Sequence, residues 1–270
     1  MSRIDVKKTY KLYINGAFPR SESGRVYEVT NAKGAFIANP ALASRKDLRD
    51  SVVAARGAFG KWSGSTAYLR GQIIYRIAEM LEGRSEQFET ELKAIGDKTK
   101  LSEAVDLIVW YAGWTDKLSA LDGVTNPVSG PFYNFTTPEA LGVVGVISKP
   151  NFLEFIDSVM SVISSGNSAV VLAPDALGIP AMSFAEVLAT SDLPAGVLNI
   201  LTGKVNELAP WMASHMDIDG LDITGAKSQG ELKVAGAENL KRIHSFGKIK
   251  NPARILAFME AKTVWHTIGI

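Results

Sequence analysis

Apolar residues recur at helical spacing through residues 44–114. Ser44 is suited to cap a helix whose apolar stripe is Leu48, Val52, Ala55 and Phe59. Three further stripes follow it: Leu69, Ile73, Ile77, Met80 and Leu81; Phe88, Leu92 and Ile95; and Leu107, Trp110, Tyr111 and Trp114. Aromatic residues in such a stripe are typical of core packing rather than of a cofactor contact. This part of the chain is therefore predicted to form four packed helices.

Two other segments show turn signals and extended patterns. Residues 12–28 alternate short apolar runs with turn signals at Asn15-Gly16 and at Glu22-Ser23-Gly24, which predicts one or two hairpin strands. Prolines and a glycine bracket residues 132–135. This second pattern predicts an extended hairpin over residues 124–138.

The second half of the chain alternates buried strands with helices. Apolar runs of strand length occupy residues 141–147, 169–172, 197–201 and 220–224. Helical segments follow these runs at 152–165, 180–190, 208–214 and from Ser228 onward. Such a β-α-β series predicts an α/β fold with a parallel, doubly wound sheet and right-handed crossovers.

Composition limits the function classes. The 270 residues are 46% hydrophobic and 21% charged, with a net charge of +1. These values are typical of a globular protein, and they give no strong field to attract nucleic acid or an anionic membrane. The N-terminus lacks an apolar signal core, and the run 141–147 is too short to cross a bilayer, so a cytoplasmic location is predicted. There is no cysteine, which excludes disulfides, thiolate metal sites and cysteine catalysis.

Several polar residues are candidates for chemistry but lack a recognisable spacing. The acidic and histidine candidates are Asp217, Asp219, Asp222, His215, His244 and His266. The three aspartates match neither a calcium loop nor a zinc motif, and the histidines show no ligand spacing, so no metal site is predicted. Residues 241–254 are rich in lysine and arginine. They fit either a contact with phosphate or an acidic partner, or a solvated linker.

Seven segments carry a resemblance to a known family. In chain order they are YINGAF, VVAARGAFGKWS, WYAGWTDKL, LGVVGVI, SSGNSAVVLAP, LPAGVLNILTG and DGLDITG. Together they resemble the first half of the aldehyde dehydrogenase superfamily, from about Lys11 to Gln229. The resemblance implies a Rossmann-like cofactor domain of the type found in that family.

A second match lies near the end of the sequence. Residues 259–266 resemble the final strand of those enzymes, which in the family joins a hairpin to form the oligomerisation element. The resemblance therefore implies that association involves six residues: Phe132, Tyr133, Phe135, Val264, Trp265 and Ile268. The implied partner is a full-length aldehyde dehydrogenase subunit or a second copy of this chain.

Only residues 231–253 separate the two matches. In the family, a catalytic domain with the nucleophilic cysteine and the general-base glutamate lies at this point, and so short a linker cannot form such a domain. The predicted organisation divides the chain into an N-terminal region, a hairpin, an α/β core, a linker and a final strand. Their bounds are 1–123, 124–139, 140–238, 239–258 and 259–270.

The positions that align with the family's cofactor site have lost polar groups. They are Ile147, Ala173, Ala176, Gly203, Gly225 and Ala226. A lysine and a glutamate that commonly hold the adenosine ribose in the family correspond to Ala173 and Ala176, and a serine of its phosphate turn corresponds to Ala226. Lys227 either compensates as a charge for phosphate or is a solvated surface residue. No bound cofactor is expected, although weak NAD(P) binding remains open.

Asn151 aligns with the asparagine that donates to the oxyanion in the family, in an altered Lys149-Pro150-Asn151-Phe152 setting. Its alternative role is to cap the helix that follows. Three functions were considered: a non-catalytic, pseudoenzyme-like subunit that acts by assembly, a degenerate NAD(P)-binding module or sensor without turnover, and an enzyme with other chemistry. The sequence favours the first, since no nucleophile–base pair supports the third.

Overall fold

A parallel sheet lies at the centre of the computed structural model, which describes residues 7–31 and 33–269. Within this described part the sheet has five strands in the order β7-β6-β5-β8-β9. Their bounds are Val143–Ile147 (β5), Ser168–Pro174 (β6), Leu198–Gly203 (β7), Gly220–Asp222 (β8) and Arg242–His244 (β9). The chain order reverses beside β5, which confirms the doubly wound α/β fold.

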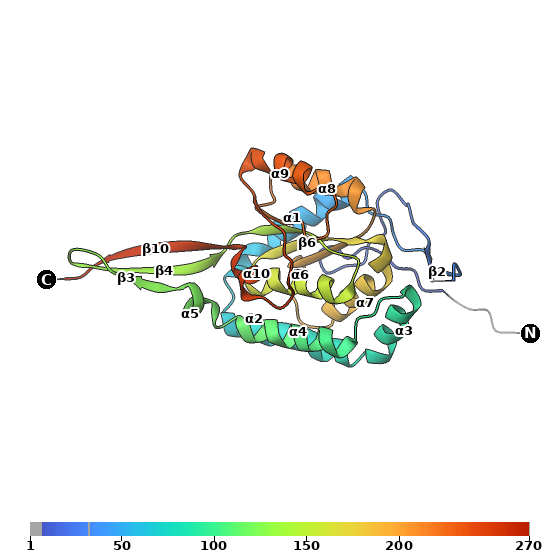
Figure 1. Ribbon diagram of the computed structural model, residues 1–270, viewed down its shortest axis with the longest axis horizontal. Coiled ribbons are helices and arrows are strands. Elements are labelled where there is room, and N and C mark those ends of the chain that lie inside the picture. Colours follow the sequence, from blue (N-terminus) through green and yellow to red (C-terminus); the bar gives the residue numbers. More distant parts are fainter. Residues whose placement is uncertain (1–6, 32, 270) are drawn as a thin grey trace, which may run out of the picture.

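Helices cover both faces of this sheet (Figure 1). One face packs on α6 (Phe152–Ser164) and α7 (Gly178–Leu188), and these in turn contact two N-terminal helices, α2 (Ala67–Glu82) and α4 (Leu101–Trp114). The other face packs on α1 (Arg45–Ser63), α8 (Val205–Ser214) and α9 (Gln229–Gly236). Because both faces are covered, the central strands are buried along their whole length, as their continuous apolar runs predict.

The four predicted N-terminal helices are present. They are α1 (Arg45–Ser63), α2 (Ala67–Glu82), α3 (Ser85–Ile95) and α4 (Leu101–Trp114). Ser44 caps α1 through a capping box with Asp47, in which each side chain bonds the other residue's backbone N–H. Tyr111 on α4 is fully buried, in agreement with the core role predicted for the aromatic stripe.

The N-terminal segment forms a short hairpin at the predicted turn. Asn15 and Gly16 have φ values of 52° and 73°, and Ile14 and Ala17 on either side exchange two backbone hydrogen bonds of 3.0 Å. The sequence did not show where this hairpin packs: Tyr13 exchanges two further backbone hydrogen bonds of 3.1 and 2.8 Å with Ile200. This segment therefore covers the outer edge of β7. A small two-stranded sheet follows it, made of β1 (Val29–Thr30) and β2 (Phe36–Ala38).

A second sheet projects from the body of the molecule (Figure 1). It is antiparallel, with the order β10-β4-β3 among the described residues. After the short helix α5 (Leu118–Asp122), the hairpin is formed by β3 (Val124–Asn126) and β4 (Phe132–Ala140), and β10 (Met259–Thr267) pairs along the full length of β4. We call these three strands the projecting sheet. The predicted hairpin is therefore present, and it is joined by the strand that closes the sequence.

Residues 239–258 connect the body to β10. They contain β9, which extends the parallel sheet beside β8, and α10 (Pro252–Leu256), which packs against α6. Neither element was predicted from the sequence. No helix in the described part of the chain is long and apolar enough to span a membrane.

Candidate functional site

The carboxyl ends of the parallel strands bring several predicted site residues together. Ile147 ends β5, and its carbonyl accepts a 2.8 Å hydrogen bond from the amide of Gly225 after β8. On the neighbouring strands, Ala173 lies opposite Thr202, and Pro174 lies opposite Gly203. The edge at which doubly wound folds bind their ligands is therefore formed by these residues.

Gly225 and Gly203 are required by close packing at this edge. A Cβ atom on Gly225 would lie 2.1 Å from the carbonyl oxygen of Ser148. Gly203 has a φ of 133°, and a Cβ there would lie 2.5 Å from Leu42 Cδ1. Gly225 thus lets two backbone segments approach each other, and Gly203 adopts a φ that other residues rarely adopt. Both structural roles operate without any ligand.

Ala173, Ala176 and Ala226 offer no polar side chain at this edge of the sheet. Ala173 is only 1% exposed and belongs to the core beneath the sheet. Ala176 lies in a short 3₁₀ helix (Asp175–Leu177) and is exposed, and its amide bonds the Asp175 carboxylate at 2.9 Å. Ala226 bonds the carbonyl of Ile223 through its own amide. The charge nearest to Ala176 is therefore negative, which disfavours a phosphate group there.

A tyrosine covers the segment that contains Ala176. The Tyr27 hydroxyl donates to the Asp175 carbonyl at 3.2 Å, and a Cβ on Gly178 would lie 2.0 Å from that hydroxyl oxygen. Burial and the nearby Asp175 carboxylate raise the pKa of Tyr27 above its ordinary value. The phenol is therefore neutral and acts as a hydrogen-bond donor at this place.

Asn151 lies at the N-terminus of α6, where its side-chain oxygen accepts the Glu154 amide at 3.1 Å. Its side-chain nitrogen donates to Asp97 and Thr99 at 3.3 and 3.2 Å. Asp97 also accepts the Phe152 amide at 2.7 Å, so a carboxylate from a distant loop satisfies the first turn of α6. In this arrangement the donor hydrogens of Asn151 already have partners within the protein.

A buried ionic cluster ties the connecting segment to the body, and sequence reasoning missed it. Arg254 on α10 is 2% exposed and donates to Asp157 on α6 and to Asp222 on β8, both fully buried. Tyr111 and Ser158 complete the cluster with hydrogen bonds of 2.7 Å to Asp157 and Arg254. Burial opposes the charged guanidinium, but the carboxylates of Asp222 and Asp157 outweigh it and raise the pKa of Arg254.

This cluster corrects part of the interpretation of residues 241–254 as a solvated basic linker. Lys248 and Lys250 are exposed as predicted. Lys241 and Arg254 are only 8% and 2% exposed, because Lys241 precedes β9 at the edge of the sheet and Arg254 pairs with buried carboxylates.

The signal for this cluster that was available in the sequence was Asp157, an acidic residue within the apolar stretch of α6 that follows Glu154 of the first turn. An aspartate at such a position requires a buried cationic partner.

The remaining polar candidates do not form a site. Arg56 bonds Asp217 and Asp219, each at 2.7 Å, and Asp222 belongs to the buried cluster. Burial lowers the pKa of His215 and of His244. Among the described residues, no group of three or more histidine, aspartate or glutamate side chains is placed to hold a metal ion.

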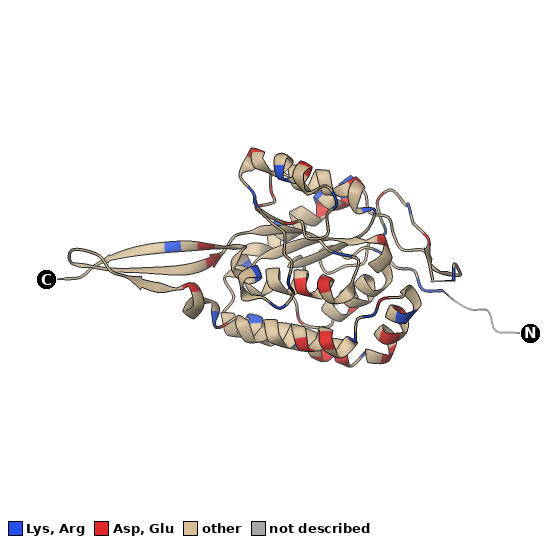
Figure 2. Ribbon diagram, viewed as in Figure 1, with Lys and Arg blue, Asp and Glu red and all other residues tan. Residues whose placement is uncertain are grey.

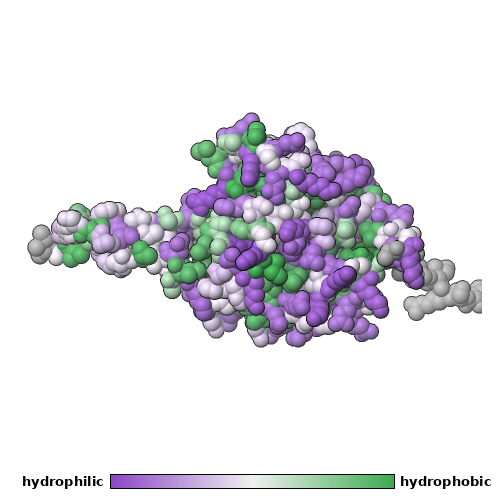
Figure 3. All heavy atoms as spheres, in the orientation of Figure 1, coloured by the Kyte–Doolittle hydropathy of each residue, from purple (hydrophilic) through white to green (hydrophobic). Residues whose placement is uncertain are grey.

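The projecting sheet exposes apolar side chains to solvent (Figure 3). Trp265 is 59% exposed and meets Phe132 edge to face, with ring centroids 5.8 Å apart. On the other face, Phe135 stacks on His266 and tilts against Tyr133. The charged residues of β4 and β10 lie in the half nearer the body and are Glu139, Glu260 and Lys262. The strands near the tip carry none (Figure 2). Apolar groups exposed in this way near the uncharged tip of the projecting sheet are typical of an association surface.

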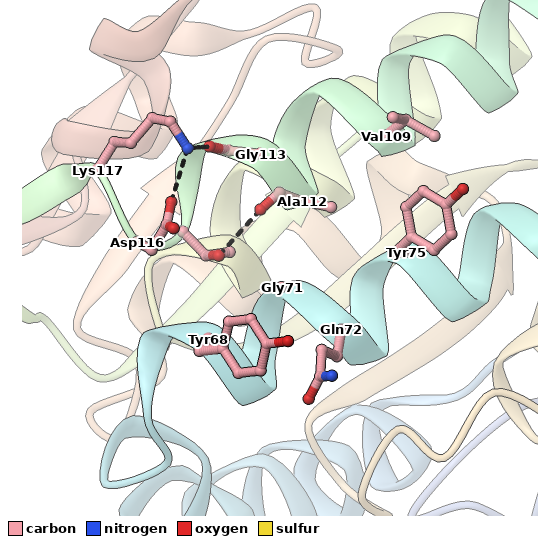
Figure 4. A pocket seen from close by; sticks show the side chains of 10 residues that line it. Tyr68, Gly71, Gln72, Tyr75, Val109, Ala112, Gly113, Asp116 and Lys117 are labelled. Atoms are coloured by element: carbon pink, nitrogen blue, oxygen red, sulfur yellow. Dashed lines mark hydrogen bonds and ion pairs between the residues drawn. The ribbon is translucent and has the colours of Figure 1, made fainter.

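An apolar groove of about 470 Å³ lies between α2 and α4. Figure 4 shows Tyr68 and Tyr75 on one side and Val109 on the other. The charged pair Asp116 and Lys117 closes one end with a contact of 2.8 Å. None of the residues that line the groove is a predicted site residue, and the groove offers no nucleophile–base pair.

The amino-acid sequence matches a protein-family model and several known proteins. The aldehyde dehydrogenase family model matches residues 18–268. Retinal dehydrogenase 2 of Mus musculus is 32% identical over 89% of this chain and 48% of its own length. Mitochondrial 10-formyltetrahydrofolate dehydrogenase of Homo sapiens is 30% identical over 90% of this chain and 28% of its own length.

Solved structures show the same relationship. The NAD+ complex of an aldehyde dehydrogenase from Bacillus cereus superposes with a TM-score of 0.81 and 25% identity, over 87% of this chain and 50% of that one. PnpE in complex with nicotinamide adenine dinucleotide gives a TM-score of 0.82 with the same identity and coverage. The chain spans half or less of the length of these relatives, and it belongs to the aldehyde dehydrogenase family.

Proposed function

We propose that this chain is a non-catalytic, aldehyde dehydrogenase-like subunit that acts by association through its projecting sheet. The observation that carries the proposal is the sheet itself. β10 pairs with β4 over nine residues, and the sheet then presents Trp265, Tyr133 and Ile268 to solvent at 59%, 47% and 52% exposure. Such a surface is normally covered in a soluble protein, and a partner chain would cover it.

Three features support a role without catalysis. The sequence has no cysteine to form a thioester or any other thiol adduct. Asn151 directs its donor hydrogens to Asp97 and Thr99. Residues 239–258 form one short strand and one short helix between the body and the projecting sheet, where the family resemblance implies a catalytic domain. The proposed partner is a chain of the same family, either a full-length catalytic relative or a second copy.

Light scattering tests this proposal. We expect the 270-residue chain, alone or mixed with a full-length aldehyde dehydrogenase from the same source, to form a complex heavier than one chain. Removal of residues 262–270 should release the monomer, because the truncation deletes Trp265 and most of β10. A Lys262→Ala variant, which changes only an exposed ion pair with Glu139, is the matched control and should assemble normally. Equal masses for the full and truncated chains would contradict the proposal.

A further inference from the structure

Along β10, the backbone N–H and C=O groups of successive residues point alternately toward β4 and toward the free edge of the strand. The amide of Ile268 donates to the Pro131 carbonyl at 2.8 Å, so the backbone groups of even-numbered residues point toward β4. Arg242 reaches the carbonyl of Met259 from the opposite edge, as expected for a residue of odd number. Pro138, which has no N–H, lies opposite Ala261, where the ladder requires none.

Besides Met259, whose carbonyl binds Arg242, four residues of β10 therefore direct their backbone groups outward: Ala261, Thr263, Trp265 and Thr267. β10 is the outermost strand of its sheet among the described residues. Its pairing with β4 runs without a bulge, and the strand contains no proline. Lys262 is its single basic side chain apart from His266, and Glu139 neutralises it at 2.9 Å. The usual devices that block pairing at an exposed edge are thus largely missing.

Resting on the proposed function, we infer that the occupant of this edge is β10 of a second copy of the chain. The two strands run antiparallel about a two-fold axis at Val264. The two projecting sheets then join into one continuous sheet of six strands. This pairing is isologous, since each copy supplies the same residues to the contact.

The strand is self-complementary in this register. Thr263 lies opposite Trp265 of the second copy, and Ala261 lies opposite its Thr267, so all four outward residues are paired in both copies. Val264 meets its own counterpart in a close, non-hydrogen-bonded pair, which suits a β-branched apolar side chain. A register centred on Thr263 would place Thr267 opposite Met259, whose carbonyl Arg242 already occupies. The register at Val264 is therefore preferred.

The charge distribution favours the same arrangement. The charged residues of β10 are Glu260 and Lys262 near the base, whereas Trp265 to Ile268 near the tip carry no permanent charge. Antiparallel pairing brings the base of one strand beside the tip of the other. It thereby separates the two Lys262 side chains and the two Glu260 side chains, which a parallel pairing would place side by side.

Because the sequence has no cysteine, one introduced cysteine is the only thiol in the chain, and a disulfide between chains can form only at that position. We expect Val264→Cys to form a disulfide-linked dimer on mild oxidation, since the two Cα atoms are about 4.5 Å apart in such a pair. Lys262→Cys is the matched control on the same face of the strand. Its two copies would be four residues out of register, about 14 Å apart, and should not cross-link.

A Thr263→Pro variant gives an independent measurement. Proline there removes an outward N–H and the exposed hydrogen bond between the hydroxyls of Thr263 and Thr136, so the circular dichroism should stay nearly unchanged while the mass by light scattering falls to that of one chain. A Thr263→Val variant, which loses only the hydroxyl bond, should keep the mass of the dimer. Equal cross-linking of Val264→Cys and Lys262→Cys would overturn the inference. A stable complex with a catalytic relative but no Val264 cross-link would also overturn it, and would leave the proposed function standing. Equal masses for the full and truncated chains in the experiment above would instead remove the proposed function.

Discussion

The parallel sheet and the projecting sheet differ in how far their side chains are buried. In the parallel sheet, β5 and β7 are buried along their whole length, and even the charges beneath the sheet have partners, as Arg254 has in Asp157 and Asp222. In the projecting sheet, Trp265 is 59% exposed and the outer edge of β10 has no partner among the described residues. The buried ion pairs are thus formed within the body, whereas the projecting sheet leaves a strand edge without a partner among the described residues.

The difference separates folding from association. The edge of the parallel sheet where relatives would be expected to hold a dinucleotide is occupied by internal contacts, such as Gly225 against Ser148 and Asn151 against Asp97. Exposed apolar side chains occur in both regions, for example Val234 and Leu240 on the body, but on the projecting sheet they lie beside a strand edge that has no partner among the described residues. Substitutions in the body should therefore change the free energy of unfolding, and substitutions in the projecting sheet should change the mass of the complex.

Arg254→Ala should have one of the largest effects on stability. It leaves two buried carboxylates without a cation, and we expect the free energy of unfolding to fall by about 3–5 kcal/mol. Urea denaturation followed by circular dichroism measures this loss. Arg76→Ala is the control, because Arg76 forms only exposed pairs with Glu79 and Asp192, and its loss should be below about 1 kcal/mol. Similar losses for the two variants would show that the buried cluster does not anchor the connecting segment.

The same substitution at two tryptophans compares the regions directly. Trp62 is fully buried and donates to the Ile163 carbonyl at 3.0 Å, so Trp62→Ala should lower the free energy of unfolding by about 3–5 kcal/mol. Trp265→Ala removes an exposed ring and one contact with Phe132, which amounts to about 0.5–1.5 kcal/mol. Light scattering should show the reverse order, with the greater loss of assembly for Trp265→Ala. An unchanged mass for Trp265→Ala would contradict the assignment of association to the projecting sheet.

Two glycines near the candidate cofactor edge give a smaller contrast. Gly225→Ala places a Cβ within 2.1 Å of the Ser148 carbonyl oxygen, and we expect a loss of about 1–3 kcal/mol. Gly230→Ala lies in α9 with no atom within 4 Å of the new Cβ, and it should stabilise the protein by about 0.4–1 kcal/mol. In thermal denaturation, the melting temperature should therefore fall for Gly225→Ala and rise for Gly230→Ala. A neutral Gly225→Ala would mean that the edge is open enough to admit a ligand.

Much of the fold could be predicted because its signals are local. The buried strands are continuous apolar runs, and the cap at Ser44 and the turn at Asn15-Gly16 involve neighbouring residues. The hairpin around β4 also carries its own turn residues. Patterns of this kind report the burial of each segment on its own, and burial on two faces was enough to indicate the doubly wound sheet.

The candidate site was harder to predict because its contacts join distant residues. Tyr13 pairs with Ile200, and Asp97 caps the helix that begins after Asn151. Arg254 lies in a basic segment whose composition is typical of an exposed linker. Its partners Asp157 and Asp222 are 97 and 32 residues away in the sequence. Local pattern cannot show which buried aspartate meets which arginine, and so it cannot show whether a basic segment is exposed.

Titration with dinucleotide should give the smallest effect. Ala173 is 1% exposed, and Ala176 lies beside the Asp175 carboxylate, so this edge offers no charged donor at either position. Each missing charged hydrogen bond corresponds to about 1.5–3 kcal/mol, which weakens binding by orders of magnitude when two are absent. With a Kd of about 10 mM or more, 1 mM NAD+ would stabilise the protein by less than about 0.1 kcal/mol. Calorimetry should then show only heats of dilution for NAD+ and NADP+, with a full-length aldehyde dehydrogenase as the positive control. Saturable binding tighter than about 0.1 mM would show that the backbone alone holds the dinucleotide, and both sheets would then carry a function.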